Sequence, residues 1–258
     1  MINPDELLDA FARQEFFLEY LPTISLADGR CVGAEALTRW RRPTGGVSPK
    51  DFIPLTENTP LPGLLTYWVI DTVAAEMGDW LRSHRDAHIS INVPPEILGR
   101  GGLLYAGDKS GLIELASQII LELTERGLPD SLAVNALNSA HKLGLRVALD
   151  DVTLVNGSNA AILARCNFDI VKLDRSLIAQ IRPNDPVPEW LGNIAALLRS
   201  SRLVVTAEGI ETKQQIMALR EAHVQTAQGF YFSPPIPAAA FIAFHREAAV
   251  PGRTMPAT

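Results

Sequence analysis

The chain of 258 residues is long enough for one large domain, and an α/β barrel typically needs about 250 residues. Hydrophobic residues make up 47% of the chain, which excludes a disordered protein, and the formal net charge of −6 argues against non-specific binding to polymeric nucleic acid or to an anionic membrane. A small phosphate ligand is not excluded, because bound metal can reverse the local sign of the electric field.

The first part of the sequence predicts a helix, a strand hairpin and two further helices. Pro4 at a first helical position, followed by apolar Leu7, Leu8 and Phe11, indicates a leading helix over residues 4–13. Strands are expected at 16–21, 23–26 and 32–40, turns at 28–30 and 43–46, and helices at 49–57 and 61–83. The chain therefore has a hairpin-like start.

From residue 88 to residue 247, predicted strands and helices alternate. Strands are expected at 88–93, 118–124, 146–150, 168–173, 203–207 and 226–232, and helices at 132–143, 158–165, 190–199, 212–222 and 238–247. Repeated strand-then-helix units imply a parallel sheet, and this many units imply a barrel. Since no linker-like composition divides the chain, we predict an α/β barrel as a single domain over 1–258, with its core over about 16–245 and a frayed tail at 251–258.

Cysteine usage and the N-terminus indicate the compartment. Cys31 and Cys166 show no pairing pattern, which favours a reducing environment without a disulfide framework. The first residues are acidic and amphipathic, unlike a signal peptide, and the apolar stretches are short and interrupted, unlike a membrane span. We therefore expect a cytoplasmic protein with no membrane span.

Polar side chains follow the apolar part of most predicted strands. They are Glu35, Asn92, Glu122, Asp150, Asp151, Lys172, Glu208 and Gln228. The intervals between these strand ends, 57, 30, 28, 22, 36 and 20 residues, are near the length of one βα unit or twice it. The strand ends of an α/β barrel converge on one mouth, so these side chains are predicted to meet there. One acidic residue after a strand is more often a helix cap or turn former, but five carboxylates at one mouth need another explanation.

The clustered carboxylates predict a metal site. Two unit charges about 4 Å apart repel by roughly 4 kcal/mol at an effective dielectric near 20, and Lys172 alone cannot neutralise five of them. The group must take up protons or hold cations, and oxygen ligands alone select Mg²⁺ or Mn²⁺. The histidines fall outside these strand ends, which argues against zinc. His84 and His88 have metal-like spacing, but their place around a helix end favours a structural role.

Adjacent aspartates suggest how such metals could act. Asp150 and Asp151 can reach two metals from neighbouring backbone positions. Two metals about 3.5–4 Å apart can bridge and deprotonate a water and stabilise an in-line attack on phosphorus. A lysine beside them can hold that water or screen developing charge.

Seven segments, in order and at suitable spacing, resemble the EAL domain family, whose members hydrolyse cyclic di-GMP to linear 5′-pGpG. The segments are Glu35-Ala36-Leu37 with Thr38-Arg39-Trp40, Asn92 in ISINVPPEIL, LELTE at 121–125, Asp150-Asp151, Lys172-Leu173-Asp174, AEGIET at 207–212, and QGFYFSPPIP at 228–237. The resemblance runs from about residue 16 to about residue 244. It implies a TIM-like (β/α)8 barrel with one antiparallel strand, which agrees with the hairpin-like start.

The resemblance also implies roles for individual residues. Glu35, Asn92, Glu122 and Asp150 would hold one metal, and Asp150, Asp151 and Glu208 the second, so that two Mg²⁺ or Mn²⁺ ions serve the site. The implied catalytic group is Lys172, which contacts the nucleophilic water, with Glu35, Glu208 and Gln228. Substrate contacts are implied for Arg39, Leu37, Asp174 and Gln228, and supporting roles for Glu125 and Glu211. A surface salt bridge is the alternative for Arg39.

Two places depart from the family pattern. After the aspartates the family usually has Phe-Gly-Thr-Gly-Tyr-Ser-Ser, whereas residues 152–158 here read VTLVNGS. β-Branched Val152 and Thr153 cannot copy a tight turn with positive φ without strain, although Asn156-Gly157 can supply a turn later. In the family this loop orders the second metal and a dimer contact. In addition, Leu21 stands where a glutamine commonly contacts ligand, which is expected to weaken binding by about 0.5–1.5 kcal/mol.

The leading prediction is a two-metal cyclic di-GMP phosphodiesterase, because every metal-ligand position is kept. The main alternative is a non-catalytic cyclic di-GMP receptor, degenerate in the loop after Asp150-Asp151, that signals through a regulatory protein partner. An unrelated barrel enzyme with Lys172 as base on a metal-bound enolate, and a pure protein-interaction module, are weaker alternatives. The expected partners are cyclic di-GMP and, as further candidates, a second copy of the chain and a regulatory protein.

Overall fold

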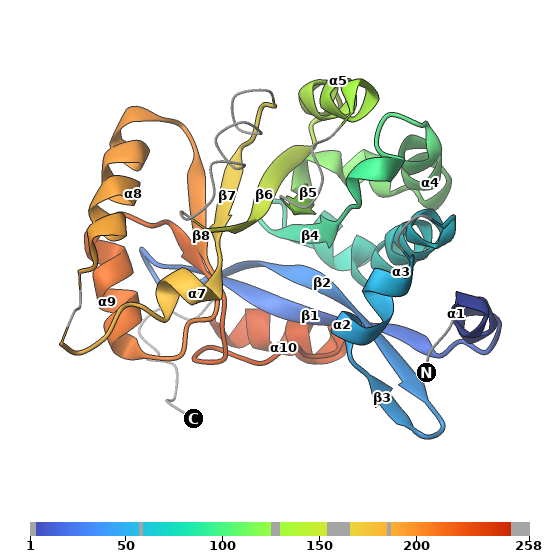
Figure 1. Cartoon of the computed structure of the whole chain (residues 1–258), viewed down its shortest axis with the longest axis horizontal. Coiled ribbons are helices and arrows are strands. Elements are labelled where there is room, and N and C mark those ends of the chain that lie inside the picture. Colours follow the sequence, from blue (N-terminus) through green and yellow to red (C-terminus); the bar gives the residue numbers. More distant parts are fainter. Residues whose placement is uncertain (1–3, 57–58, 125–129, 154–165, 185–186, 249–258) are drawn as a thin grey trace.

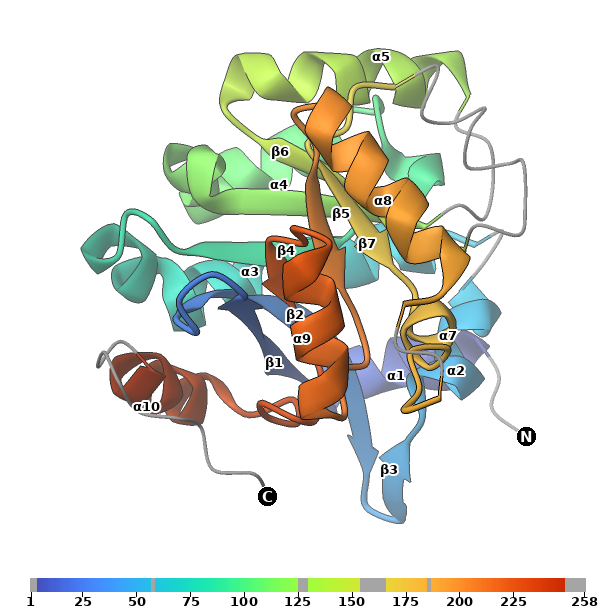
Figure 2. The same ribbon diagram turned by 90° about the vertical axis from the view of Figure 1, so that its left-hand side faces the viewer.

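The computed structural model describes residues 4–56, 59–124, 130–153, 166–184 and 187–248. Within these ranges the chain forms a closed sheet with helices around it (Figure 1, Figure 2). The predicted helix at 158–165 and the predicted tail at 251–258 lie outside the described residues. None of the described helices is long and apolar enough to cross a membrane.

In the described part of the chain, nine strands form one sheet, and all of them except β3 close into the barrel. Their bounds are β1 (Phe16–Ser25), β2 (Cys31–Arg42), β3 (Gly45–Val47), β4 (His88–Asn92), β5 (Ile119–Thr124), β6 (Arg146–Val152), β7 (Ile170–Leu173), β8 (Val204–Ala207) and β9 (Thr226–Ala227). β1 runs antiparallel to both β2 and β9, whereas the strands from β2 through β4 to β9 pair in parallel. β3 extends β2 as a hairpin. The TIM-like barrel with one antiparallel strand is therefore confirmed.

Helices cover the outside of the barrel (Figure 2). The long ones are α3 (Leu61–Ser83), α4 (Gly102–Ser110), α5 (Ser131–Ala140), α8 (Glu189–Ser200), α9 (Lys213–Glu221) and α10 (Ala238–Ala248), and the others are α1 (Pro4–Ala12), α2 (Pro49–Phe52) and α7 (Arg175–Ile178). Short 3-10 turns lie at Ile53–Thr56, Pro95–Ile97, Leu112–Gln118 and His141–Leu143. α9 begins with a capping box, in which Thr212 and Gln215 each accept a hydrogen bond from the other's backbone N–H.

Two large hydrophobic clusters hold the helices on the barrel. One joins α3 and α10 to β1, β2, β4 and β5, with Met77, Leu81 and Phe241 fully buried. The other joins α7, α8 and α9 to β7 and β8. A third cluster packs Leu7 and Ala10 of α1 against aromatic side chains of β1 and β2. Each fully buried large apolar side chain stabilises the fold by about 1.5–3 kcal/mol, so these clusters fix the strands that carry the polar residues.

The structure differs from the sequence predictions at several elements. β1 runs unbroken through Pro22, which pairs with Ala34, because a proline is tolerated where a strand needs no N–H donor. The helix predicted at 49–57 is the short α2 followed by a 3-10 turn. Sequence patterns gave no element for 94–117, where α4 and two 3-10 turns lie, or for α7 and β3.

The last barrel strand ends earlier than predicted. β9 stops at Ala227, not at residue 232, because the next residues turn back toward the end of β8. Gly229 has φ +154°, and a Cβ there would lie 2.2 Å from the backbone nitrogen of Ile210. The Tyr231 N–H then donates to the Ile210 carbonyl at 2.9 Å. Only glycine allows this close approach, so the strand prediction beyond Ala227 was wrong.

Candidate active site

Four carboxylates surround the ammonium group of Lys172 at the carboxyl ends of the barrel strands. Lys172 Nζ lies 2.7 Å from Glu122 Oε2 and 2.7 Å from Glu208 Oε1. It also lies 3.0 Å from Glu35 Oε2 and 3.2 Å from Asp150 Oδ1. β2, β5, β6, β7 and the residue after β8 each provide one member. The predicted convergence of strand ends on one mouth therefore occurs.

The register of the parallel strands explains why these side chains meet. Asn92 at the end of β4 pairs with Glu122 of β5, and Glu35 of β2 pairs with Ser90, two residues before Asn92 on β4. Since side chains alternate along a strand, residues two positions apart share a face. The Asn92 Nδ2 donates to Glu35 Oε1 at 2.9 Å, which joins Asn92 to the carboxylate group.

Burial of these charged side chains raises the free energy of their ionised forms. Lys172 and Glu122 are each 2% exposed, and Glu35 and Asp150 are also buried. Removing a charge from water costs several kcal/mol unless another charge or a metal compensates for it. One ammonium facing four carboxylates leaves a formal excess of negative charge.

The pKa values reflect this excess. Burial, together with the repulsion of Glu35, raises the pKa of Glu122 well above its usual range, and burial raises the pKa of Asp150 as well. Burial also raises the pKa of Glu208 to about 8. Burial opposes ionisation of Glu35, but the attraction of Lys172 and the hydrogen bond from Asn92 outweigh it, so its pKa is lowered. In the absence of further positive charge, part of the group therefore favours the protonated form.

A bulge in β6 turns two consecutive aspartates toward the mouth. The pairing of β6 with β7 shifts register between Leu149 and Val152. Asp151 takes φ +54°, and its backbone N–H donates to Asp150 Oδ1 at 2.9 Å. Neighbouring residues of a regular strand face opposite sides, whereas a bulge re-aims a side chain. Asp is among the residues that tolerate positive φ, so the sequence permits this geometry.

The carboxylates form two groups that fit divalent cations. Glu35, Glu122 and Asp150 each offer an oxygen within 4.8 Å of the others, and so do Asp150, Asp151 and Glu208. Asp150 belongs to both groups. An all-oxygen donor set of high negative charge suits Mg²⁺ or Mn²⁺, and cations would remove the excess charge that raises the pKa values. The donor set thus fits two ions that share Asp150.

The other candidate residues make different contacts. Gln228 is 1% exposed, and its Nε2 donates to Thr23 Oγ1 at 2.8 Å and toward the Leu21 carbonyl at 3.4 Å. Arg39 forms an ion pair with Glu19 at 2.8 Å, with both side chains about a quarter exposed at 23% and 25%. The salt bridge considered for Arg39 is therefore present.

The remaining candidates are placed as follows. Asp174 caps α7, because its Oδ1 accepts from the Ser176 N–H at 2.9 Å, and Leu37 is half-buried on β2. The backbone N–H of Glu211 donates to Gln215 Oε1 at 2.9 Å. Glu125 and most of the altered loop, residues 154–158, lie outside the described residues.

Sequence reasoning missed two features of the site. It gave no role to Thr23, whose hydroxyl orients Gln228 from the antiparallel strand β1. It also overlooked Gly209, whose φ of +68° and close approach to Arg175 let the chain turn directly after Glu208. The acidic-residue-glycine pair in 207–212 carries a signal for the second feature, because a glycine after a strand often marks a tight turn.

Comparison with known proteins places this geometry in a family. A family model for the EAL domain matches residues 5–235. The "Probable cyclic di-GMP phosphodiesterase PdeB" of Escherichia coli (strain K12) is 35% identical over 240 residues, which cover 92% of this chain and 46% of the relative. The "Cyclic di-GMP phosphodiesterase NbdA" of Pseudomonas aeruginosa is 34% identical, with 97% of this chain and 33% of the relative covered. The chain thus spans less than half the length of these curated relatives.

A solved structure agrees with the sequence comparisons. The "PaMucR Phosphodiesterase, c-di-GMP complex" superimposes with a TM-score of 0.81 at 30% identity, covering 92% of this chain and 98% of that one. The family match extends over most of the chain and includes all the strands that supply the carboxylate group. The chain belongs to the EAL domain family.

Proposed function

We propose that this chain hydrolyses cyclic di-GMP to linear 5′-pGpG with two bound Mg²⁺ or Mn²⁺ ions. The observation that carries the proposal is the pair of carboxylate groups that share Asp150 around Lys172. The curated relatives named as cyclic di-GMP phosphodiesterases support the same reaction and the same substrate.

In this proposal the chain's own residues hold the ions and orient the reactants. Glu35, Asn92, Glu122 and Asp150 would hold one ion, and Asp150, Asp151 and Glu208 the other. The ions would supply an activated water and stabilise charge on the phosphoryl oxygens.

Lys172 has a distinct task in the reaction. Its ammonium group donates to carboxylate oxygens that would bind the cations instead. Freed from them, it would donate a hydrogen bond to the attacking water and hold that water in line with the scissile P–O bond. Arg39, Leu37, Asp174 and Gln228 are proposed to contact the substrate, and Glu125 and Glu211 to support the site.

The test follows linear product by chromatography after the purified chain is incubated with cyclic di-GMP and Mn²⁺ or Mg²⁺. We expect turnover that chelator abolishes and that Glu35→Gln removes. The matched control is Glu114→Gln, because Glu114 is exposed on the barrel exterior. Turnover that survives both chelator and Glu35→Gln would contradict the proposal.

The second candidate is a cyclic di-GMP receptor without turnover. It is favoured by residues 152–158, where VTLVNGS lacks the early glycines of the family loop. A receptor binds cyclic di-GMP, by calorimetric titration, but gives no linear product with either metal. Replacing residues 152–158 by the family's Phe-Gly-Thr-Gly-Tyr-Ser-Ser should then restore turnover if this loop is the cause.

We also propose that the chain acts in the cytoplasm and that a binding partner regulates its reaction. Cys31 and Cys166 are both buried and are not joined in a disulfide, which suits a reducing compartment. A regulatory protein partner or a second copy of the chain is proposed to control the reaction. Sedimentation with and without cyclic di-GMP tests for the second copy.

A further inference from the structure

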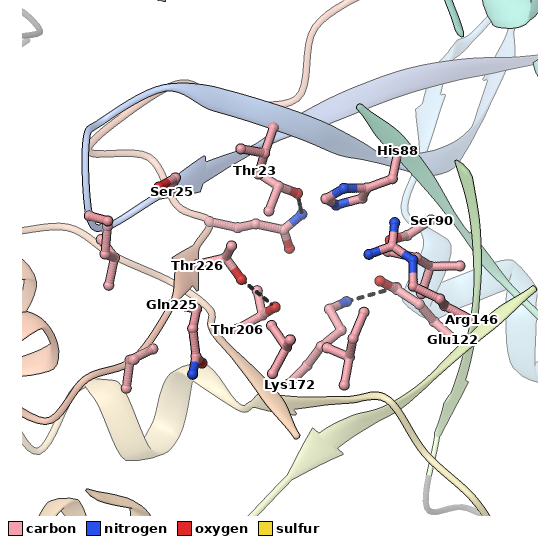
Figure 3. A pocket seen from close by; sticks show the side chains of 18 of the residues that line it. Thr23, Ser25, His88, Ser90, Glu122, Arg146, Lys172, Thr206, Gln225 and Thr226 are labelled. Atoms are coloured by element: carbon pink, nitrogen blue, oxygen red, sulfur yellow. Dashed lines mark hydrogen bonds and ion pairs between the residues drawn. The ribbon is translucent and has the colours of Figure 1, made fainter. Parts of the chain in front are cut away.

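The amino-terminal end of the barrel contains a cavity of about 650 Å³ (Figure 3). Barrel interiors are normally filled by layers of bulky branched side chains. Two positions before Glu35, Asn92, Asp150 and Glu208 the residues are small, namely Gly33, Ser90, Ala148 and Thr206, whereas Ile120 precedes Glu122. At Gly33 a Cβ would lie 2.3 Å from the His88 carbonyl, so no side chain fits there. Small residues below the mouth therefore leave the base of the barrel open.

The wall of this cavity has an apolar part and a polar part. Ile120 and Ile170 form a small apolar cluster inside the barrel, and Val204 packs against it. The remaining interior wall carries hydroxyl groups, His88 and Arg146. Figure 3 shows the Arg146 guanidinium pointing into the cavity, toward His88. A ligand with one polar end and one apolar end matches such a wall.

Two residues that line the cavity each have a buried polar atom without a hydrogen-bond partner in the part of the chain that the structure describes. The two atoms are Arg146 Nε and Gln228 Oε1. Gln228 is 1% exposed, and its Nε2 is already engaged by Thr23. A buried donor or acceptor without a partner destabilises the folded chain, and a charged group does so more strongly. A ligand that accepts from Arg146 and donates to Gln228 would relieve this destabilisation.

The charge at the base is positive and uncompensated by a direct ion pair in the described ranges. Burial and the nearby Arg146 lower the pKa of His88 to about 3, so His88 is neutral near pH 7. The negative charge of Asp169 attracts the guanidinium of Arg146. The carboxylate oxygens of Asp169, however, form hydrogen bonds with the His141 ring and with the Val147 N–H. Asp86 also lines the cavity, and Glu122 is held by Lys172. Arg220 also lines the cavity, and its Nε donates to the Leu26 carbonyl. Among the described cationic groups that line the cavity, Arg146 is therefore the one whose Nε has no hydrogen-bond partner.

We propose that the base of the barrel binds a small organic anion, a carboxylate or a phosphate monoester on an apolar body. The anion accepts from Arg146, and the apolar body lies on Ile120, Ile170 and Val204. A protonated oxygen of the ligand, or a water that it holds, donates to Gln228. The site lies at the amino-terminal end of the barrel, and its inner limit is formed by Lys172 and Glu122, which also belong to the mouth.

The test uses benzoate and phenyl phosphate as probes on the intact chain, in chelator and without cyclic di-GMP. With ¹⁵N-labelled arginine, the resonance assigned to the Arg146 Nε–H by its loss in Arg146→Lys should shift saturably with at least one probe. Nuclear Overhauser contacts should join the aromatic protons of the probe to the methyl groups of Ile120 and Ile170. The probe that binds more tightly identifies the anion as carboxylate or phosphate.

Two variants test whether Arg146 contributes to binding of the probe. Arg146→Met should weaken binding on the order of tenfold or more, because a charge-assisted hydrogen bond is lost. The matched control is Arg39→Met at the mouth, which should leave binding unchanged. An unshifted Arg146 resonance with both probes at millimolar concentration would overturn the proposal, and so would contacts to residues of the mouth alone. Because metal and cyclic di-GMP are absent, this result is independent of the phosphodiesterase test.

Discussion

The two ends of the barrel differ in charge, although the same strands build both. At the mouth, one ammonium faces four carboxylates, and the excess is negative. At the base, Arg146 faces neutral His88 and hydroxyl groups, and the excess is positive. On β4, the inward residue at the mouth is Asn92, and the next inward residue toward the base is Ser90. On β6, Asp150 at the mouth is followed toward the base by Ala148 and then by Arg146. The difference teaches that one set of barrel strands can carry opposite net charge at its two ends.

The largest expected effect separates the mouth from the base through Asp150. Asp150→Asn should lower kcat for cyclic di-GMP more than about a thousandfold, because one side chain serves both metal groups and metal ions supply several kcal/mol of transition-state stabilisation. Initial rates at saturating Mn²⁺ measure the change. Asp86→Asn at the base is the matched control and should leave kcat within about twofold. Equal losses in the two variants would contradict the division between the ends.

Lys172 is predicted to stabilise the metal-free mouth. Lys172→Met should lower the free energy of unfolding by about 3–5 kcal/mol in chelator, because it leaves four buried or partly buried carboxylates without their cation. Denaturant titration measures the loss, and added Mn²⁺ should recover part of it. The exposed Lys142→Met provides the control and should change stability little. A stable Lys172→Met protein without metal would show that protonation alone balances the carboxylates.

The mouth was largely predictable from sequence, whereas the base was not. Most mouth residues lie at or near the end of an apolar strand, so period and spacing together placed Glu122, Lys172 and Glu208 at one edge, although Glu35 lies within the longer β2. The bulge at Asp150-Asp151 was not predictable, because both residues are acidic and a regular strand would separate them. The cavity depends on what small residues such as Ser90 leave unfilled, and no local pattern encodes an empty volume. For the same reason the early end of β9 depended on a contact with Ile210, distant in sequence.

The pH dependence of stability should have opposite signs at the two ends. For the mouth, burial raises the pKa of Glu208 from 4.5 to about 8 in the folded chain. Between these values the unfolded chain releases a proton that the folded chain keeps, so stability in chelator should fall as pH rises from 4.5 to 8. Glu122 and Asp150 act in the same direction, and Glu35 opposes them. Denaturant titrations across this range should show a shallower slope in Glu208→Gln, and an unchanged slope would contradict the assignment.

For the base, the smaller effect arises from His88. Its pKa falls from 6.5 to about 3 on folding, so the unfolded chain binds a proton that the folded chain rejects. Stability from this group is complete above pH 6.5 and is lost as pH falls toward 3. The acid-side slope should decrease in His88→Gln and persist in the control His223→Asn, which alters an exposed residue with φ +62°. Equal acid-side slopes in the unchanged chain and in both variants would show that His88 does not contribute to the pH dependence of stability.

The number of metal ions that the mouth binds distinguishes two carboxylate sites from one or none. Titration of the metal-free chain with Mn²⁺, followed by the electron paramagnetic resonance of free Mn²⁺, should give two ions per chain. Glu122→Gln and Asp151→Asn should each weaken one site, and Asp150→Asn should weaken both, because Asp150 is common to the two carboxylate groups. No specific binding, or a single site that is indifferent to Asp150, would contradict the two-metal mouth.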